Sequence, residues 1–559
     1  VYSETMKTIQ VESREARRAA ARTMRALSVL VSAFLFTAVG WSEAPRATAL
    51  PLQESLGVTA ATPPISPHTK IGNRTFDEWR SIVDDYLGPG VGTSEKLRIF
   101  DLAWDDLDRD YGAFMNLEVD MSALRRRYRQ EIRGGVSKGR FAAIMNHLSL
   151  AMKDAHTVIM SRSVNWGTYI DIGTPLFVVG GWGDNSPFGA ALTPMDDGSL
   201  LVYRVTPNHV LGLEPGDLVL GYDGVRWSEL YRQLLAAEFP ITLQRYWGST
   251  DDAMEHCFLM SAGMNWHLFD TIDIKKYGSD ELVSLPTALL RNQQGRVWGN
   301  EQLPVAGVEM PDFINEDYIT YGVIEGSQIG YIYVASWSWE EQHEISEQWY
   351  EAIDELMHHH ETIGLVVDFR INYGGDMREA HSGYSLLFNE KITAVDFDER
   401  GDPDDHLDMV PSRTHSRWLF TFRGDPDTFY DKPMAVLFGP GAVSNGDWES
   451  LRMGFHPWVR TFGKPTNGAF TISNFPDLGE DWFYTKATGS GYLIDGHHYL
   501  AHTAVQPEVE IWLDRDDVAA GRDTVVEAAI QWIRGRWPRH PGARLTPSSP
   551  PHQKKGRRR

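Results

Sequence analysis

The stretch IGLVVDFRINYGG, residues 363–375, decides the fold of this 559-residue chain. Its first part, Ile363 to Phe369, is apolar apart from one aspartate, a pattern typical of a strand buried on both faces. Such strands belong to sheets that are covered by helices. The stretch ends in Gly374 and Gly375, where backbone N–H groups can approach a ligand atom closely because no Cβ intervenes. We therefore expect an α/β core whose central strand ends in a turn able to bind a ligand atom.

The segments on either side of this stretch repeat the alternation of strand and helix. Ile329–Val334 is predicted to be a strand, and apolar residues spaced from Ile345 to Met357 predict an amphipathic helix. A further helix is expected after Gly375, and Met434–Phe438 predicts another buried strand. The α/β core is therefore expected to span residues 326–537.

A single serine, Ser444, follows the second buried strand in the stretch GPGAVSNGDW, residues 439–448. A helix beginning there would direct free N–H groups and a partial positive charge at its first turn, which favours a developing oxyanion beside the serine. A serine at this place is equally typical of an ordinary helix N-cap. Both interpretations remain open from the residues alone.

A candidate for a general base, His156, lies in the stretch LAMKDAHT, residues 150–157. Helical spacing of apolar residues from Leu97 to Met160 places this stretch at the end of an N-terminal helical region. A neutral imidazole at His156 is suited to accept a proton near pH 7. A lone histidine is more often structural, so the residues around His156 must decide between a structural and a catalytic role.

Taken together, these stretches resemble the family that contains the C-terminal processing, or tail-specific, peptidases and the tricorn proteases. The resemblance implies that Ser444 is the nucleophile and His156 the general base. It also implies that backbone N–H groups of Gly374, Gly375 and Asn445 hold the oxyanion. The implied fold is multidomain α/β, with an N-terminal helical domain, a PDZ-like β domain and a core of the tail-specific-protease (ClpP/crotonase-like) type.

Two departures from the family pattern affect the expected chemistry. Ala469 stands where the C-terminal processing branch has a lysine base, and Lys464 comes about five residues too early, so a Ser–His pair is favoured over a Ser–Lys pair. Ala501 stands where the tricorn-like branch has a glutamate that orients the histidine. Asp154 and Asp447 are the candidates for a replacement acid, and Asp495 is a further possible substitute.

These departures leave two functions open. The first is a secreted serine-type endopeptidase that hydrolyses polypeptides by acyl transfer. The second is a catalytically impaired binding or carrier protein that keeps the peptidase fold. No cofactor and no metal is expected for either function.

The region between the helical domain and the core contains a phrase that resembles a PDZ domain. Gly212–Leu220 contains a Gly-Leu-x-x-Gly-Asp turn followed by an apolar strand, and Tyr222–Val225 reads as a hairpin, although an ordinary β-hairpin is the alternative. A PDZ-like module would bind C-terminal polypeptide tails at a strand edge. The expected organisation is a signal peptide at 1–49, a linker at 50–73, a helical domain at 74–165, a PDZ-like domain at 166–240, an insertion of uncertain fold at 241–325, the core at 326–537, and a disordered basic tail at 538–559.

Composition and charge restrict the partners and the compartment. The net charge of -23 disfavours nucleic acid and anionic lipid as partners, and a single cysteine, Cys257, excludes an intrachain disulfide. Several arginines precede an apolar run from Ala26 to Gly40 and the small residues Ala47–Ala49, which is typical of a secretory leader. We expect export to the periplasm or the exterior without a stable membrane span, or a membrane anchor if the leader is not cleaved.

Overall fold

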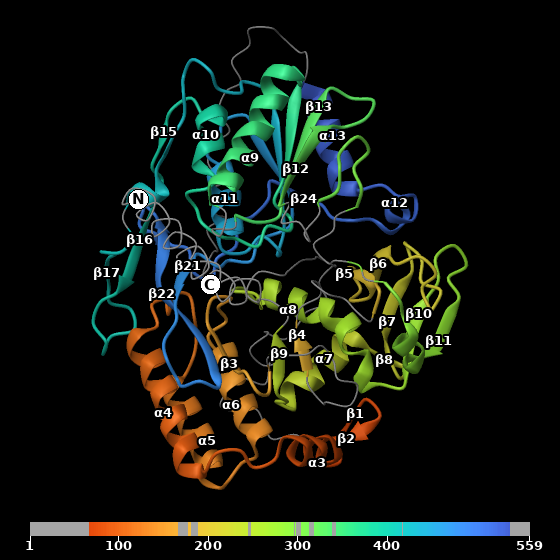
Figure 1. Cartoon of the computed structure of the whole chain (residues 1–559), viewed down its shortest axis with the longest axis vertical. Helices are drawn as coiled ribbons and strands as arrows, with labels where there is room; N and C mark the ends of the chain where they lie inside the picture. The colour runs from red at the N-terminus through yellow and green to blue at the C-terminus, as the bar shows by residue number, and fades with distance from the viewer. Residues whose placement is uncertain are drawn as a thin grey trace, which may run out of the picture.

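The computed structural model describes residues 66–165, 177–179, 188–243, 247–295, 297, 303–311, 318–337, 342–415 and 417–536. These residues form N-terminal helices, a β-rich unit and an α/β core (Figure 1), which confirms the predicted multidomain α/β architecture with helices at the N-terminus. The leader predicted for 1–49, most of the linker and the tail predicted for 538–559 lie outside the described residues. In the described part of the chain, no helix is long and apolar enough to cross a membrane.

The helices between Thr93 and Leu150 pack around one apolar core, whereas the helix before them packs through Trp79 on the core of the β-rich unit. Phe100, Tyr128 and Leu148 are buried in the first of these cores, and Thr75, Asp120 and Ser137 accept N-terminal backbone hydrogen bonds at the starts of three helices. The last helix before His156 is buried along almost its whole length. The elements are β1 (Lys70–Ile71), β2 (Arg74–Thr75), α3 (Phe76–Leu87), α4 (Thr93–Asp110), α5 (Met121–Arg133), α6 (Lys138–Leu150) and β3 (Val158–Ser161).

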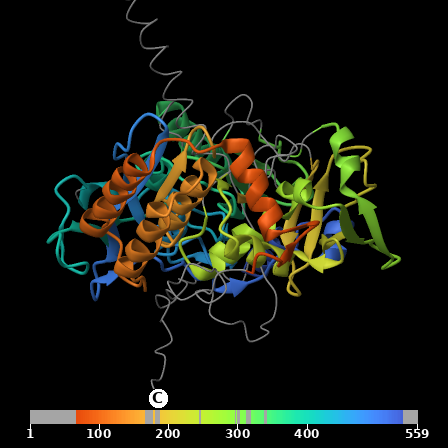
Figure 2. The same ribbon diagram turned by 90° about the horizontal axis from the view of Figure 1, so that it is seen from below.

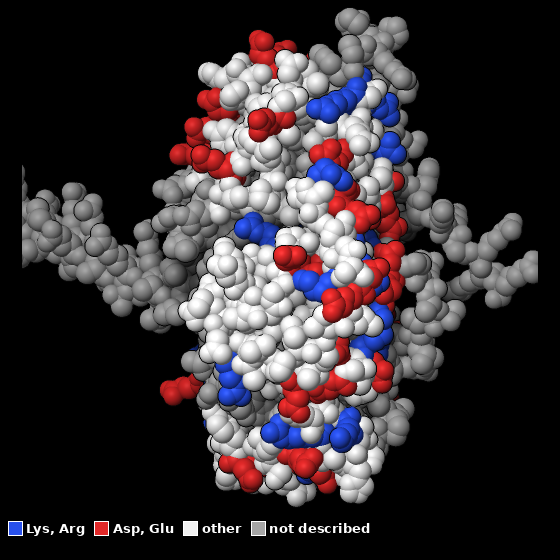
Figure 3. Space-filling model, turned by 90° about the vertical axis from the view of Figure 1, so that its right-hand side faces the viewer, with Lys and Arg blue, Asp and Glu red and all other residues white. Residues whose placement is uncertain are grey.

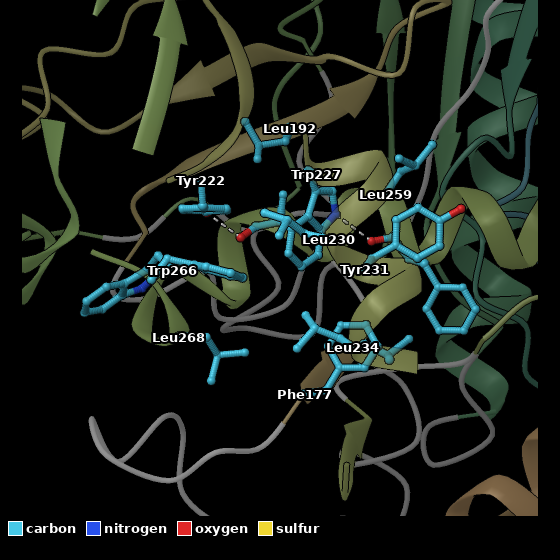
Figure 4. Close-up of a cluster of buried hydrophobic side chains, with 14 of the residues drawn as sticks. Phe177, Leu192, Tyr222, Trp227, Leu230, Tyr231, Leu234, Leu259, Trp266 and Leu268 are labelled. Atoms are coloured by element: carbon cyan, nitrogen blue, oxygen red, sulfur yellow. Dashed lines mark hydrogen bonds between the residues drawn. The ribbon is translucent and has the colours of Figure 1, made fainter. Parts of the chain in front are cut away.

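The β-rich unit combines the segment predicted to be PDZ-like with the segment for which no fold was predicted. One sheet has the order β11-β10-β7-β6-β5, with β8 paired to β7. Trp227 lies at the centre of its core, between Tyr222 and Tyr231 (Figure 4), and residues from both segments share this core. The elements are β4 (Phe177–Val179), β5 (Ala190–Pro194), β6 (Leu200–Val205), β7 (Leu218–Tyr222), β8 (Val225–Arg226), α7 (Trp227–Ala236), β9 (Ile241–Leu243), α8 (Asp251–Met260), β10 (Thr271–Lys275) and β11 (Leu282–Pro286), with short 3-10 turns at Ser261–Met264, Trp266–Leu268 and Thr287–Asn292.

The α/β core is built on a sheet of order β12-β13-β14-β19-β20-β24, in which all neighbours except β12 and β13 are parallel. Alternate residues of its strands enter two separate apolar clusters, one on the side of α13 and the other on the side of α9 and α10. Covering both faces in this way explains the continuous apolar runs in the sequence. The elements are β12 (Ile319–Val323), β13 (Ile329–Val334), α9 (Gln342–Asp354), the π-helical turn Glu355–His359, β14 (Gly364–Asp368), α10 (His381–Leu387), β19 (Met434–Phe438), α11 (Asn445–Met453), β20 (Val459–Gly463), β24 (Val509–Glu510), α12 (Arg515–Ala519) and α13 (Thr524–Arg536).

A third sheet connects the N-terminal helices to the core. Its long strand β22 pairs with β16 and β21, and its first residues pair with β3, which directly follows α6. Segments more than 300 residues apart in the chain are therefore neighbours on one strand. The remaining elements are β15 (Lys391–Ile392), β16 (Val395–Arg400), β17 (Met409–Pro411), the 3-10 turn Arg417–Phe420, β18 (Phe422–Arg423), β21 (Thr471–Asn474), β22 (Trp482–Leu493) and β23 (His498–Tyr499).

The view from below shows how the units are placed (Figure 2). The orange helices α4 to α6 lie at one side, the yellow-green strands of the β-rich unit lie at the other, and α3 lies between them. On the face drawn in Figure 3, acidic and basic side chains are mixed along one side, next to a broad area with few charged residues. Among the described residues drawn on that face, basic side chains form no continuous surface of the kind that binds polyanions.

Candidate active site

Ser444 lies on a strained turn that joins β19 to α11. Its backbone has φ 58° and ψ −120°, a conformation that costs a residue with a side chain on the order of 1–3 kcal/mol. Ser444 occupies the N-cap position of α11, yet its hydroxyl makes no capping hydrogen bond. The hydroxyl is therefore not engaged in the structural role that the sequence left open.

The Gly-Gly turn after β14 lies against the Ser444 turn. Strands β14 and β19 are parallel neighbours, with Asp368 paired to Leu437, so the segments that follow them emerge at the same edge of the sheet. The Val443 N–H donates to the Asn372 carbonyl over 2.9 Å. A Cβ built on Gly374, whose φ is +90°, would lie 2.6 Å from the Cβ of Ser444, so only glycine fits at this position without movement.

Of the backbone N–H groups near Ser444, one already donates a hydrogen bond within the protein and two do not among the described residues. The Gly374 N–H donates to Asn372 Oδ1 over 3.0 Å, and the Asn372 side chain in turn donates to the Val334 carbonyl. The Gly375 N–H and the Asn445 N–H, at the first position of α11, have no acceptor among the described residues. These two N–H groups are therefore the ones that remain for an oxyanion.

The charged residues of the same stretch anchor the end of β14. Arg370 is buried, and its guanidinium donates to the carboxylates of Asp368 and Asp523, the latter at the start of α13. The shortest N–O distances are 2.6 and 2.8 Å. This network fixes the strand end that leads into the Gly-Gly turn.

His156 lies on the loop between α6 and β3 and is buried. Its Nδ1 is 2.6 Å from the hydroxyl oxygen of Thr471, the first residue of β21. Burial lowers the pKa of His156 below its usual 6.5, although the nearby Asp154 carboxylate opposes this shift. The neutral imidazole that a general base requires is therefore favoured near neutral pH.

Two polar residues connect the His156 loop to the Ser444 turn. The Ala155 N–H donates to the Ser249 hydroxyl over 2.9 Å, and the Ser249 N–H donates to Asn467 Oδ1 over 3.0 Å. The Asn467 N–H then donates to the Ala442 carbonyl over 3.1 Å, two residues before Ser444. Ser249 belongs to the segment 241–325, and no motif marked it in the sequence.

The two candidate acids make different contacts. Asp154 accepts hydrogen bonds from the hydroxyls of Thr157 and Thr471, and so reaches His156 through one hydroxyl. Asp447 accepts from the N–H groups of Gly468 and Ala469, which holds the segment that leads to Thr471. Burial raises the pKa of Asp447 to about 7, although hydrogen bonds from Thr466 and from backbone groups oppose this shift.

Three further positions bear on the choice of base. Lys464 is buried at the end of β20, where burial lowers its pKa to about 7 against the opposing charge of Glu510. Ala469 and Ala501 are fully buried, so the described structure has a methyl group at both places where related branches carry an ionisable side chain. The Ala501 carbonyl accepts a hydrogen bond from the Asn116 side chain.

The structure thus brings the predicted site residues together in two groups. Ser444, Gly374, Gly375 and Asn445 meet at the carboxyl ends of β14 and β19. His156 and Asp154 meet around Thr471, and the segment 466–471 connects this group to Asp447 and Ala442. In the described ranges, no group of three or more His, Cys, Asp or Glu residues could hold a metal ion.

A serine on a strained strand-to-helix turn, beside a Gly-Gly turn at the edge of a parallel sheet, has the placement that a serine nucleophile requires. Residues 328–511 match the sequence model of peptidase family S41, and the chain therefore carries an S41 peptidase domain. No curated protein sequence matches the chain significantly.

Two solved structures of mature CPAF share the fold over most of the chain, and a third structure shows a weaker similarity. Mature CPAF matches with a TM-score of 0.55 at 13% identity, covering 82% of this chain and 99% of that one. Mature CPAF complexed with lactacystin matches with a TM-score of 0.53 at 12% identity, covering 79% of this chain and 98% of that one. A photosystem II D1 C-terminal processing protease gives a TM-score of 0.37 at 16% identity, covering 75% of this chain and 94% of that one. At these identities the similarity to CPAF concerns the fold alone.

Proposed function

We propose that the protein is a catalytically competent serine-type endopeptidase that hydrolyses polypeptides by acyl transfer. The observation that carries this proposal is the position of Ser444, whose hydroxyl stands on a strained turn against Gly374 without serving as a helix cap. A backbone strained at a residue with no capping role is typical of a functional site. The S41 domain supplies the class of reaction.

The proposed steps assign one role to each residue. Ser444 Oγ attacks the scissile carbonyl carbon while His156 accepts the hydroxyl proton. The carbonyl oxygen becomes an oxyanion and is held by the N–H groups of Gly375 and Asn445, the latter at the positive end of α11. His156 then gives its proton to the leaving amine, and water hydrolyses the acyl-enzyme in the same manner.

A second candidate function is a binding or carrier protein that keeps the fold without turnover. The buried methyl groups of Ala469 and Ala501 favour it, because each replaces an ionisable residue used in a related branch. The polar contacts around His156 favour the peptidase instead, because a hydroxyl and a carboxylate on the Nδ1 side of the ring are the groups that orient a histidine base.

For the substrate, we propose that a polypeptide tail adds as a strand to the sheet of the β-rich unit, as in PDZ-like recognition. This is supported by β11, which pairs with β10 on one side and has no described strand on the other. Its side chains alternate between exposed and half-buried positions, which suits recognition of alternate residues of an added strand. Nucleic acid is not proposed as a partner, because the net charge is -23.

For the compartment, we propose export, with residues 1–49 acting as a signal peptide. The support is the sequence pattern alone: arginines, an apolar run and small residues before Leu50.

The decisive experiment compares the wild-type protein with Ser444→Ala. A fluorophosphonate probe should label the wild type and not the variant, and a denatured-protein mixture should gain new termini, detected by mass spectrometry, only with the wild type. Equal labelling of both would refute the assignment of Ser444. Labelling of the wild type at Ser444 without any new termini would favour the binding protein.

A further inference from the structure

We propose that Thr471 and Asp154 are positioning residues that hold the neutral His156 ring with its proton on Nδ1, so that Nε2 is the atom that accepts the proton of Ser444. This inference deepens the proposed function and rests on it for the role of Nε2. Its geometric part, the location of the proton on the ring, can be tested without any activity.

The position of one hydroxyl between two groups carries the argument. Thr471 Oγ1 is 2.6 Å from His156 Nδ1 and 3.1 Å from Asp154 Oδ1. A carboxylate can only accept, and a threonine hydroxyl has one proton to donate. If that proton goes to Asp154, the Nδ1 contact requires a proton on Nδ1, and the neutral ring then carries its lone pair on Nε2.

The other contacts of Asp154 keep its oxygens in the accepting role. The Thr157 hydroxyl accepts from the Ala487 N–H over 3.1 Å and donates to Asp154 Oδ2 over 2.6 Å. The His156 backbone N–H points at Oδ1 over 3.2 Å. Asp154 is fully buried, and both of its oxygens accept hydrogen bonds from the groups around it.

Strand pairing fixes the distance between the two partners. β22 pairs with β3 through Thr485 and Val158, and with β21 through Ser490 and Thr471. The residue before β3 is Thr157, so the His156 loop and Thr471 are held by the same strand. Their separation is thus set by backbone hydrogen bonds rather than by flexible side chains.

This arrangement supplies an acid to orient His156, which the sequence lacks at the position expected from the tricorn-like branch. In a Ser-His-acid arrangement, the acid fixes the histidine tautomer and stabilises the imidazolium that forms during reaction. Ala501 leaves no acid at the position where the tricorn-like branch has its glutamate. We assign the role of the orienting acid to Asp154, which lies two residues before His156 in the chain and contacts its ring through the Thr471 hydroxyl.

The test uses ¹⁵N-histidine NMR on the full-length Ser444→Ala protein, with His156→Asn added to assign the resonance. We expect a protonated Nδ1 and an unprotonated Nε2 near neutral pH. In Ser444→Ala/Thr471→Val this preference should be lost, and in Ser444→Ala/Thr471→Ser it should be retained. A protonated Nε2 in the Ser444→Ala protein would overturn the proposal.

Activity provides an independent measurement. In the otherwise native enzyme, Thr471→Val should lower kcat by about 10- to 100-fold with little change in KM, because the loss of orientation acts on the chemical step. Thr471→Ser should restore most of the rate. Full kcat in Thr471→Val would overturn the proposal. An inactive wild type would refute the proposed function instead, while the NMR result would still decide where the ring proton lies.

Discussion

Gly374 lies so close to Ser444 that a Cβ on the glycine would be 2.6 Å from the Cβ of the serine. The same added atom would lie 3.0 Å from the Asn445 nitrogen, an N–H proposed to hold the oxyanion. Gly374→Ala should therefore displace both the nucleophile and its helix. We expect kcat/KM to fall by about 100-fold or more. The substrate for this measurement is a peptide whose cleavage is identified from the new termini in the denatured-protein mixture.

Gly479 provides a matched control for backbone strain. Its φ of +104° is similar to the +90° of Gly374, but a Cβ there would meet nothing within 4 Å. Gly479→Ala should cost about 1–2 kcal/mol of unfolding free energy and leave kcat/KM nearly unchanged. If both variants lost activity equally, crowding at Ser444 would not be the cause.

The backbone strain at Ser444 should be measurable as a difference in the free energy of unfolding between two variants. With φ 58°, Ser444 adopts a backbone conformation that glycine reaches without penalty, whereas alanine does not. In urea unfolding, Ser444→Gly should be more stable than Ser444→Ala by about 1–3 kcal/mol. Neither variant should react with a fluorophosphonate, and equal stability of the two would show that the turn stores no strain.

The pH profile should distinguish the two candidate bases. Burial holds the pKa of His156 below 6.5, so a histidine base stays neutral until the pH falls below that value. The pKa of Lys464 lies at about 7, so a lysine base would lose activity from about pH 7 downwards. We expect the acid limb of kcat/KM, which reports the free enzyme, to lie below pH 6.5.

Two variants check this assignment. His156→Asn should remove most of the rate, while Lys464→Met, which keeps the length of the side chain without its charge, should retain most of it. An acid limb at about pH 7 that disappears in Lys464→Met would identify the lysine as the base.

The buried ion network should contribute strongly to stability. Arg370→Met would leave the carboxylates of Asp368 and Asp523 buried without their cation, at a cost of about 3–5 kcal/mol in chemical unfolding. Arg98→Ala removes the exposed pair with Glu95, which solvent screens, and should change the free energy of unfolding far less. Similar costs for the two variants would mean that the network does not anchor β14.

The α/β core was the part of the fold most accessible to sequence reasoning. Ile329–Val334 and Met434–Phe438 coincide with β13 and β19, because strands buried on both faces must be apolar throughout. The segment 241–325 was not accessible in the same way. Its strands β10 and β11 are short and partly exposed, and although they pair with each other, only the contact of β10 with β7 joins them to the rest of the sheet.

The polar residues around His156 could not be predicted from the sequence either. Thr471 and Ser249 lie 315 and 93 residues from His156 in the chain, and hydroxyl residues at such distances carry no signal of their own. Their roles arise from strand pairing along β22 and from the contact with Asn467. Ser444 and Gly374 were different, because each follows a buried strand whose end is visible in the sequence.

The pairing of β3 with β22 divides the proposed machinery between two lengths of polypeptide. The S41 match at residues 328–511 contains Ser444 and Thr471, whereas Asp154, His156 and Ser249 all precede it. A recombinant product trimmed to the matched domain would thus hold the nucleophile without its base. In the proposed mechanism the N-terminal helices are a component of the catalyst rather than an appendage, and two separately made halves should recover turnover only by reassembling along that strand.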